Sequence, residues 1–218
     1  MAVQEDRADN IYDQSDGSHT EHGKHFDRFG MFVDDLNGIT EAVFRPAAPC
    51  ERVVVFGHSF GGLIAIHWML RGASVRRAVI QSPALGFGVP VPPWKDLMAR
   101  GLARWCPRFG VPTGMDPRWI SRDPQVVRDY RADPKIRVRL SAGSYRELSR
   151  GMREARDTAG QIQTPTLLLL GGSDRVISVE AARQWYAGIP AEKQLKEFPG
   201  AYHELHNDSL MPVLSEVI

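Results

Sequence analysis

The sequence is poor in the features that mark secretion, a membrane span or a disulfide scaffold. Its two cysteines, Cys50 and Cys106, are too few for a disulfide framework or a four-ligand zinc site. The first residues carry no apolar segment that could serve as a signal peptide, and nowhere do about 18 apolar residues run together. These absences predict a soluble protein without a transmembrane segment, located in the cytoplasm.

Net charge is also nearly absent. The chain has 27 Lys and Arg against 26 Asp and Glu, which gives a formal charge of +1. Proteins that bind nucleic acid through a broad basic surface carry a clear positive excess. We therefore expect no nucleic-acid partner.

The length of 218 residues, with 43% hydrophobic residues, suits one sizeable core, so residues 1–218 are predicted to form a single domain. Residues 1–30 are polar and contain no run long enough for a buried strand, which predicts a poorly ordered lead. Apolar positions then recur at helical spacing between Met31 and Phe44. They predict an amphipathic helix through Phe32, Leu36, Ile39 and Val43.

Four short apolar runs follow, at residues 53–56, 78–80, 166–170 and, more weakly, 195–198. They do not alternate with polar residues, which is typical of strands buried on both faces of a parallel sheet. Helical patterns at 62–71, 178–188 and 205–218 would supply the cover. The fold class predicted is α/β, with a mostly parallel sheet and flanking helices.

About 80 residues separate the second and third runs, too many for a simple crossover, and nine of the fifteen prolines fall between Pro83 and Pro134. We expect a helical cap insertion over residues 84–160, with residues 161–218 completing the core. A stripe of large apolar residues within it is interleaved with basic residues. Two interpretations stand for this stripe: it packs the lid onto the core, or it makes transient contact with a membrane surface.

A nucleophile turn is predicted directly after the first strand. The motif Gly57-His58-Ser59-Phe60-Gly61-Gly62 contains G-x-S-x-G, and a helical pattern follows at once. A serine on such a sharp strand-to-helix turn projects its hydroxyl above the sheet, and small residues on either side let strand and helix approach. Gly57 and Gly61 meet that need, and Ser59 is the expected nucleophile.

A serine hydroxyl needs a base and an acid that orients the base. Asp174 follows the third strand and His203 follows the fourth, so both fall where open α/β sheets place their sites. Two alternatives remain open: Asp174 could cap the next helix, and His206 could replace His203 as the base. His58 is interpreted as turn packing, because adjacent residues on a tight turn point apart.

A metal site is not expected. Three histidines are spaced as H-x-x-H-x-x-H, which on a helix would gather them for a metal, but Gly17 and Gly23 argue against that helix. The three are His19, His22 and His25. The isolated Cys106 carries no signal for nucleophilic or redox chemistry.

The chain resembles the monoacylglycerol lipase and lysophospholipase branch of the α/β-hydrolases. Besides the nucleophile turn, the resemblance rests on residues 82–86, 171–176 and 199–205, and it runs from about Asp16 to the end of the chain. It implies a serine esterase or lipase with a lid, a small-molecule lipid or ester substrate, and no metal or organic cofactor. The roles it implies are Ser59 as nucleophile, His203 as general base then acid, Asp174 as the group that orients the imidazole, and the Phe60 backbone N–H as oxyanion donor.

The sequence departs from that family ahead of the nucleophile turn. Only 56 residues precede Gly57, whereas the family carries several earlier strands and a His-Gly segment that supplies half of the oxyanion hole. The one such pair, His22-Gly23, follows polar residues. The chain is therefore expected to be N-terminally abbreviated, with the 53–56 strand at an open edge that could pair in a homodimer.

Three functions stay open at this stage. The first is ester hydrolysis through an acyl-serine intermediate. The second is a catalytically weak or inactive hydrolase fragment or scaffold with an incomplete oxyanion hole. The third uses the same triad as an aminopeptidase or acyltransferase.

Overall fold

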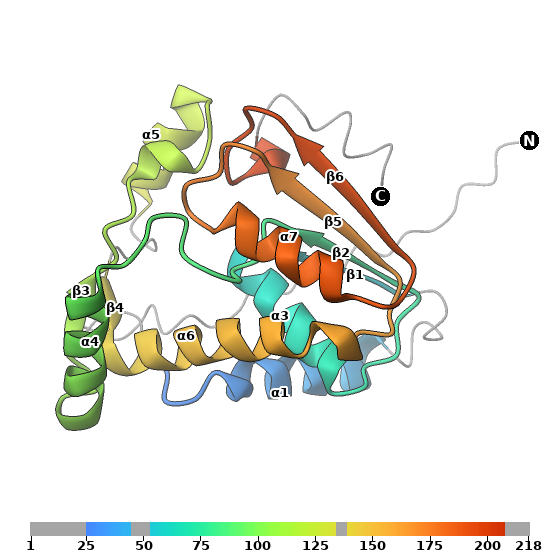
Figure 1. Ribbon diagram of the computed structural model, residues 1–218, viewed down its shortest axis with the longest axis horizontal. Helices are drawn as coiled ribbons and strands as arrows, with labels where there is room; N and C mark the ends of the chain where they lie inside the picture. The colour runs from blue at the N-terminus through green and yellow to red at the C-terminus, as the bar shows by residue number, and fades with distance from the viewer. Residues whose placement is uncertain (1–24, 45–52, 134–138, 208–218) are drawn as a thin grey trace, which may run out of the picture.

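The computed structural model describes residues 25–44, 53–133 and 139–207 (Figure 1). Several sequence predictions lie outside these residues. They are residues 1–24 of the predicted poorly ordered lead, with His19, His22 and Gly23, Cys50, and the predicted helix beyond residue 207. The prediction is wrong for residues 25–30, because Phe29 is buried in the core, Phe26 packs against it and α1 begins at Gly30.

A four-stranded parallel sheet forms the centre of the protein. Its strands are β1 (Val54–His58), β2 (Arg77–Gln81), β5 (Thr166–Gly171) and β6 (Lys193–Phe198). They lie in the order β1-β2-β5-β6, and every neighbouring pair is parallel. The predicted α/β fold class is confirmed, because the apolar runs become the strands of a parallel sheet.

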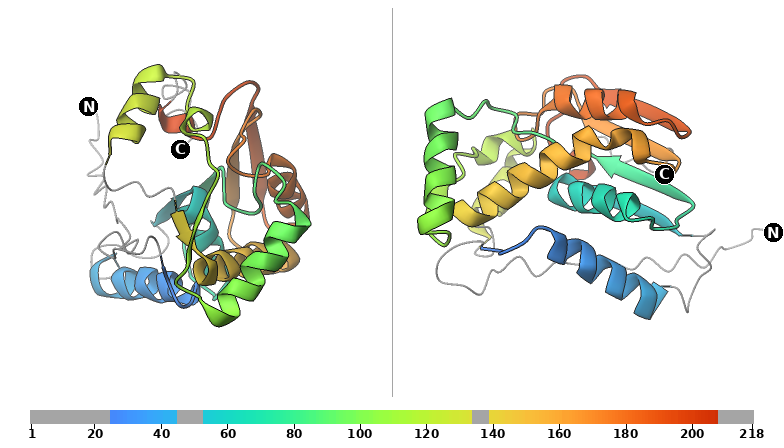
Figure 2. Two further views of the ribbon diagram at one scale, coloured as in Figure 1. Left: turned by 90° about the vertical axis from the view of Figure 1, so that its left-hand side faces the viewer. Right: turned by 60° about the horizontal axis from the view of Figure 1, so that its bottom comes forward.

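Helices cover one face of this sheet. They are α1 (Gly30–Ile39), α3 (Ser59–Leu70), α6 (Ala142–Asp157) and α7 (Val179–Gly188), and Figure 2 shows α1, α3 and α6 packed beside one another. A π-helical turn, Thr40–Phe44, extends α1. Helix α3 is apolar nearly all round, as expected of a helix enclosed between a sheet and other helices.

The two faces of the central strands belong to different core clusters, because side chains alternate along a strand. Toward the helices, the larger cluster includes Ala78, Ile80, Leu168 and Leu170. On the opposite face, the smaller cluster comprises Val79, Leu167, Leu169, Phe198, Ala201 and Leu205. Leu205 begins the short 3-10 helix Leu205–Asn207. Strands β2 and β5 are therefore buried on both faces, as their sequences predicted.

Strand β1 is the exception, and the expectation that it is buried on both faces is wrong. It lies at one edge of the sheet, and the side chains of Val54 and Phe56 are 44% and 47% exposed. Its other face packs on α3, since Val55 contacts the larger cluster. Among the described residues, the smaller cluster contains none from β1, so the face that carries Phe56 does not share the core that covers β2 and β5.

The segment between β2 and β5 forms a lobe beside the carboxyl ends of the strands (Figure 1). It contains α4 (Pro93–Trp105), β3 (Gly110–Pro112), a 3-10 turn (Pro117–Trp119), α5 (Pro124–Ala132) and β4 (Arg139–Ser141). Strands β3 and β4 pair antiparallel in a separate small sheet. Helix α6 leaves this lobe and reaches the main core with Met152 and Ala155, followed by the 3-10 turn Ala159–Gln161.

None of the helices in the described ranges is both long and apolar enough to cross a membrane.

Candidate active site

Ser59 lies on a sharp turn between β1 and α3. Its φ is +53°, a left-handed conformation that is costly for a residue with a side chain. The backbone N–H of Ala84 donates to the Ser59 carbonyl oxygen over 2.9 Å and holds the turn from the β2 side. Strand and helix approach so closely that a Cβ at Gly57 would lie 2.9 Å from the Gly62 Cα.

The close approach falls on Gly62 rather than on Gly61. A Cβ at Gly62 would lie 3.2 Å from the Gly57 carbonyl oxygen and from Pro83, whereas a Cβ at Gly61 would meet nothing within 4 Å. The steric need assigned to Gly61 is therefore wrong. The residue three places after the serine, not two, faces the strand, because the helix turns Gly61 outward.

A continuous hydrogen-bonded chain links Ser59, His203 and Asp174. Ser59 Oγ lies 2.9 Å from His203 Nε2, and His203 Nδ1 lies 2.7 Å from Asp174 Oδ2. These residues follow β1, β6 and β5, and the carboxyl ends of parallel strands meet at one edge of the sheet. The imidazole is 5% exposed and the carboxylate is fully buried, so water is largely excluded from their contact.

The second oxygen of Asp174 is held by its own loop. Oδ1 accepts hydrogen bonds from the backbone N–H groups of Val176 at 2.8 Å and Ile177 at 3.1 Å. The alternative that Asp174 caps the following helix is wrong. Ser178 caps α7, since its side chain accepts from the Ala181 N–H at 3.2 Å.

His206, the alternative base, lies near the triad but is directed elsewhere. The amide Nε2 of Gln81 donates to Nδ1 of His206 at 2.8 Å and to Nδ1 of His58 at 3.0 Å. The His58 ring packs against the His203 ring with 4.7 Å between centroids. The structure thus brings His203 to Ser59, and it places His58 and His206 in a neighbouring polar cluster.

Both flanking imidazoles favour the neutral state. Burial, and then the nearby His203 and His206, hold the pKa of His58 well below its ordinary value. Burial also lowers the pKa of His206. Sequence patterns did not single out Gln81 as part of the site. A polar residue at the end of an otherwise apolar, buried strand is a signal that could have indicated it.

The Phe60 backbone N–H, expected as an oxyanion donor, lies in the first turn of α3. Phe60 is the second residue of α3, where backbone N–H groups have no carbonyl partner within the helix. It is also the residue next to Ser59. The His22-Gly23 pair lies outside the described residues.

Residues considered for other chemistry have partners other than the triad, or are exposed. His25 Nδ1 is 2.7 Å from Ser141 Oγ and its Nε2 is 3.1 Å from Asp27. In the described part of the chain, no group of three or more His, Cys, Asp or Glu is arranged to hold a metal ion. Cys106 is exposed and is not in a disulfide.

Comparison with known proteins places these features in a family. The profile described as "Serine aminopeptidase, S33" matches residues 12–210, which is most of the chain. The chain belongs to this family. The resemblance to monoacylglycerol lipase-like α/β-hydrolases is thereby confirmed, and this S33 family member is a hydrolase whose relatives include monoacylglycerol lipases and a phospholipase.

Individual relatives of this S33 family member cover most of it. A phospholipase from Bacillus subtilis is 26% identical over 196 residues, which span 88% of this chain and 74% of that protein. A monoacylglycerol lipase from Mycolicibacterium smegmatis is 30% identical over 200 residues, 87% of this chain and 70% of that protein. An uncharacterized abhydrolase domain-containing protein from Dictyostelium discoideum is 30% identical over 158 residues, which are 17% of its length.

Among solved structures, the monoacylglycerol lipase of Paleococcus ferrophilus superposes on the S33 chain with a TM-score of 0.79 at 29% sequence identity. The match covers 90% of this chain and 77% of that one.

Proposed function

We propose that the protein is a serine hydrolase that cleaves carboxylic esters of lipid-like substrates, such as monoacylglycerols or lysophospholipids, through an acyl-Ser59 intermediate. The observation that carries the proposal is the hydrogen-bonded chain from Ser59 Oγ through the His203 imidazole to Asp174. A hydroxyl with an imidazole nitrogen at 2.9 Å has a base within the reach it needs for nucleophilic attack.

The reaction proceeds in two halves. His203 Nε2 takes the hydroxyl proton while Ser59 Oγ attacks the ester carbon. The ester carbonyl oxygen becomes negatively charged and accepts a hydrogen bond from the Phe60 N–H. His203 then gives the proton to the departing alcohol, which leaves the acyl group on Ser59. A water molecule gives a proton to the same imidazole as its oxygen attacks the acyl carbon. The bond from that carbon to Ser59 Oγ then breaks, His203 returns the proton to Ser59 Oγ, and the carboxylic acid leaves.

Asp174 orients the imidazole through both halves. Its Oδ2 accepts the Nδ1–H of His203, which leaves the Nε2 lone pair facing Ser59. The same carboxylate stabilises the imidazolium that forms when His203 holds the serine proton.

Labelling with a fluorophosphonate, followed by mapping of the modified residue, tests the nucleophile. We expect label on Ser59, no label in Ser59→Ala, and slow labelling in His203→Ala. Parallel turnover of p-nitrophenyl esters and aminoacyl nitroanilides tests the reaction. An unlabelled Ser59 in folded protein would contradict the triad, and faster turnover of the anilides would contradict ester specificity.

The lobe supports a lipid-like substrate and transient contact with a membrane surface. Large apolar side chains are exposed along and just beyond α4, namely Trp94, Leu97, Met98, Trp105 and Phe109. Basic side chains lie over two of the indoles, Lys95 over Trp94 and Arg104 over Trp105. Apolar residues flanked by cations suit the boundary of an anionic lipid surface.

Vesicle flotation tests this contact. We expect the protein to float with phosphatidylcholine vesicles that contain phosphatidylglycerol, more than with phosphatidylcholine alone. Leu97→Glu should abolish flotation, whereas Val43→Glu, which adds the same charge at an exposed apolar position of the helical turn after α1, should not. Equal flotation of both variants would contradict a role for α4.

A further inference from the structure

The strained turn at Ser59 needs support from outside the turn. A non-glycine residue at a φ of +53° persists only where its surroundings fix it. The Ala84 N–H fixes the carbonyl of Ser59 from one side. Phe60 follows Ser59 in the turn. Its position matters for the reaction, because its N–H is the proposed oxyanion donor.

Three phenylalanine rings surround the Phe60 ring. Phe32 lies 5.1 Å from it and Phe29 lies 5.8 Å from it, centroid to centroid, both edge-on. Phe26 lies 6.0 Å away. Edge-to-face contacts at these separations are favourable and directional. We call Phe26, Phe29 and Phe32 the phenylalanine clamp.

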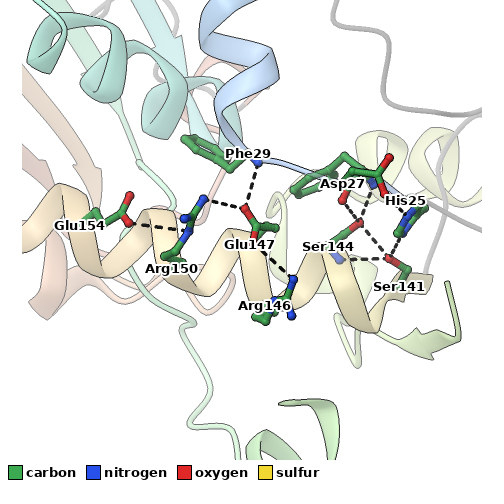
Figure 3. A network of polar contacts seen from close by, with 10 residues as sticks. His25, Asp27, Phe29, Ser141, Ser144, Arg146, Glu147, Arg150 and Glu154 are labelled. Atoms are coloured by element: carbon green, nitrogen blue, oxygen red, sulfur yellow. Dashed lines mark hydrogen bonds and ion pairs between the residues drawn. The ribbon is translucent and has the colours of Figure 1, made fainter. Parts of the chain in front are cut away.

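Hydrogen bonds join the clamp to α6, which lies more than a hundred residues later in the sequence (Figure 3). The Phe26 N–H donates to Ser144 Oγ at 2.7 Å, and the Phe29 N–H donates to Glu147 Oε2 at 3.4 Å. Glu147 is 8% exposed and is paired with Arg150 at 2.7 Å. These contacts fix the backbone of the clamp, not only its rings.

One face of α6 is shaped for this contact. Ser144, Glu147 and Gly151 are three and four residues apart, so they share a face of the helix. A Cβ at Gly151 would lie 3.2 Å from the ring of Phe29, so a larger residue would push the clamp away. The polar anchors and the small residue together seat Phe29, which is 3% exposed.

We propose that the phenylalanine clamp and its anchor Glu147 are positioning elements that aim the Phe60 N–H at the oxyanion formed on Ser59 acylation. The proposal rests on the proposed function, because it assigns a purpose to the Phe60 N–H in that reaction. When the ring of Phe60 is held in place, the Cα and the backbone N–H of the same residue keep one orientation. If the ring could shift, the strained turn would relax and the N–H would swing away from the reacting carbonyl.

The variant Phe32→Leu tests the clamp directly, and Ile162→Val is its control. Ile162 is fully buried and precedes the amino end of the interior strand β5, whereas Ser59 follows the carboxyl end of the edge strand β1. We therefore expect Ile162→Val to cost stability without touching the turn. Because deleting an oxyanion donor lowers kcat about 10² to 10³-fold, misaiming it should lower kcat about tenfold. We expect that fall in Phe32→Leu with KM nearly unchanged, and no fall in Ile162→Val at a temperature where both are folded.

A second readout separates aiming from general damage. Ser59 Oγ can add to the carbonyl carbon of a trifluoromethyl ketone that bears the substrate's acyl chain, while His203 takes the serine proton. The former carbonyl oxygen is then an oxyanion in the complex. A matched ether, which cannot react, binds without one. We expect Phe32→Leu to weaken binding of the ketone by the same factor as kcat, and to leave binding of the ether unchanged.

Glu147 supplies a test by conservative rescue. Glu147→Ala removes the acceptor of the Phe29 N–H, and Glu147→Gln keeps an oxygen there. We expect Glu147→Ala to lower kcat and ketone affinity together, and Glu147→Gln to restore most of both.

The outcomes are distinguishable. Suppose that the wild type is active and that its activity depends on Ser59. This proposal alone is then overturned if Phe32→Leu and Ile162→Val have the same kcat, or if Phe32→Leu weakens binding of the ether as much as binding of the ketone. A folded wild type that turns over no ester and takes no label at Ser59 overturns the proposed function and, with it, the purpose assigned to the clamp.

Discussion

Asp174→Asn is the substitution whose effect the structure defines most closely. The two oxygens of Asp174 have separate duties: Oδ1 accepts two loop N–H groups, and Oδ2 accepts the Nδ1–H of His203. An asparagine can keep its oxygen at the loop, since that site only accepts. Its amide nitrogen then faces His203, where it can only donate.

That donation forces the wrong tautomer on the imidazole. Nδ1 must accept, so the proton moves to Nε2 and points at Ser59 Oγ, which leaves no lone pair to take the serine proton. In a serine protease triad the same exchange lowers kcat by about 10⁴, or about 5.4 kcal/mol of transition-state stabilisation. We expect a loss of that order in kcat/KM for a p-nitrophenyl ester, with a melting temperature close to that of the wild type.

Asp174→Ala is the matched control for the fold. It leaves the N–H groups of Val176 and Ile177 without their acceptor, and each unsatisfied buried donor costs about 1–3 kcal/mol. Both variants should lose activity, but only Asp174→Ala should melt clearly lower. The reasoning is refuted if Asp174→Asn keeps more than a tenth of the wild-type activity, or if the two variants melt together.

Three further outcomes are expected. Gly57→Ala should destabilise the protein by about 1–3 kcal/mol and abolish activity, because its Cβ would strike the backbone of α3, whereas Gly61→Ala should melt like the wild type; the reverse order in thermal melts would contradict the packing at the turn. Tyr145→Phe removes the hydroxyl that donates to Asp96 at 3.1 Å and should speed amide hydrogen exchange in α4, and unchanged exchange there would show that this bond does not hold the helix. The urea midpoint of unfolding should fall as the pH drops below about 6.5, because histidines with lowered pKa values take up protons only on unfolding. The buried His58 alone would lower the free energy of unfolding by up to about 1.4 kcal/mol near pH 5.5. The slope should decrease in His58→Gln, and a midpoint independent of pH would contradict the lowered pKa values of His58, His67 and His206.

Much of the fold could be predicted because the strands are short and continuously apolar. The run at 166–170 became β5 (Thr166–Gly171) nearly residue for residue, and even the weak run at 195–198 lies within β6. The order of Ser59, Asp174 and His203 along the chain also needed only local patterns. Each of these residues directly follows a strand, and a parallel sheet brings such positions together.

What the sequence did not predict depends on contacts between distant segments. The exposure of Phe56 follows from what covers each face of β1, which the apolar run itself does not encode. The need for Gly62 rather than Gly61 depends on how α3 is rotated against the strand. The role of Gln81 depends on two imidazoles from different elements, His58 at the end of β1 and His206 in the short 3-10 helix after β6. Such tertiary neighbours leave no periodic signal.

The anchoring of residues 26–29 on α6 has a consequence for synthesis on the ribosome. The first partner of this segment, Ser144, emerges more than a hundred residues after it, following the whole lobe. Contacts of such large sequence separation form late, because the intervening chain must close first. A nascent chain that ends within the lobe can therefore pair β1 with β2, but its serine turn still lacks one of its supports. The turn should gain this support once α6 has left the exit tunnel, and hydrolytic competence should follow when Asp174 and His203 have emerged as well.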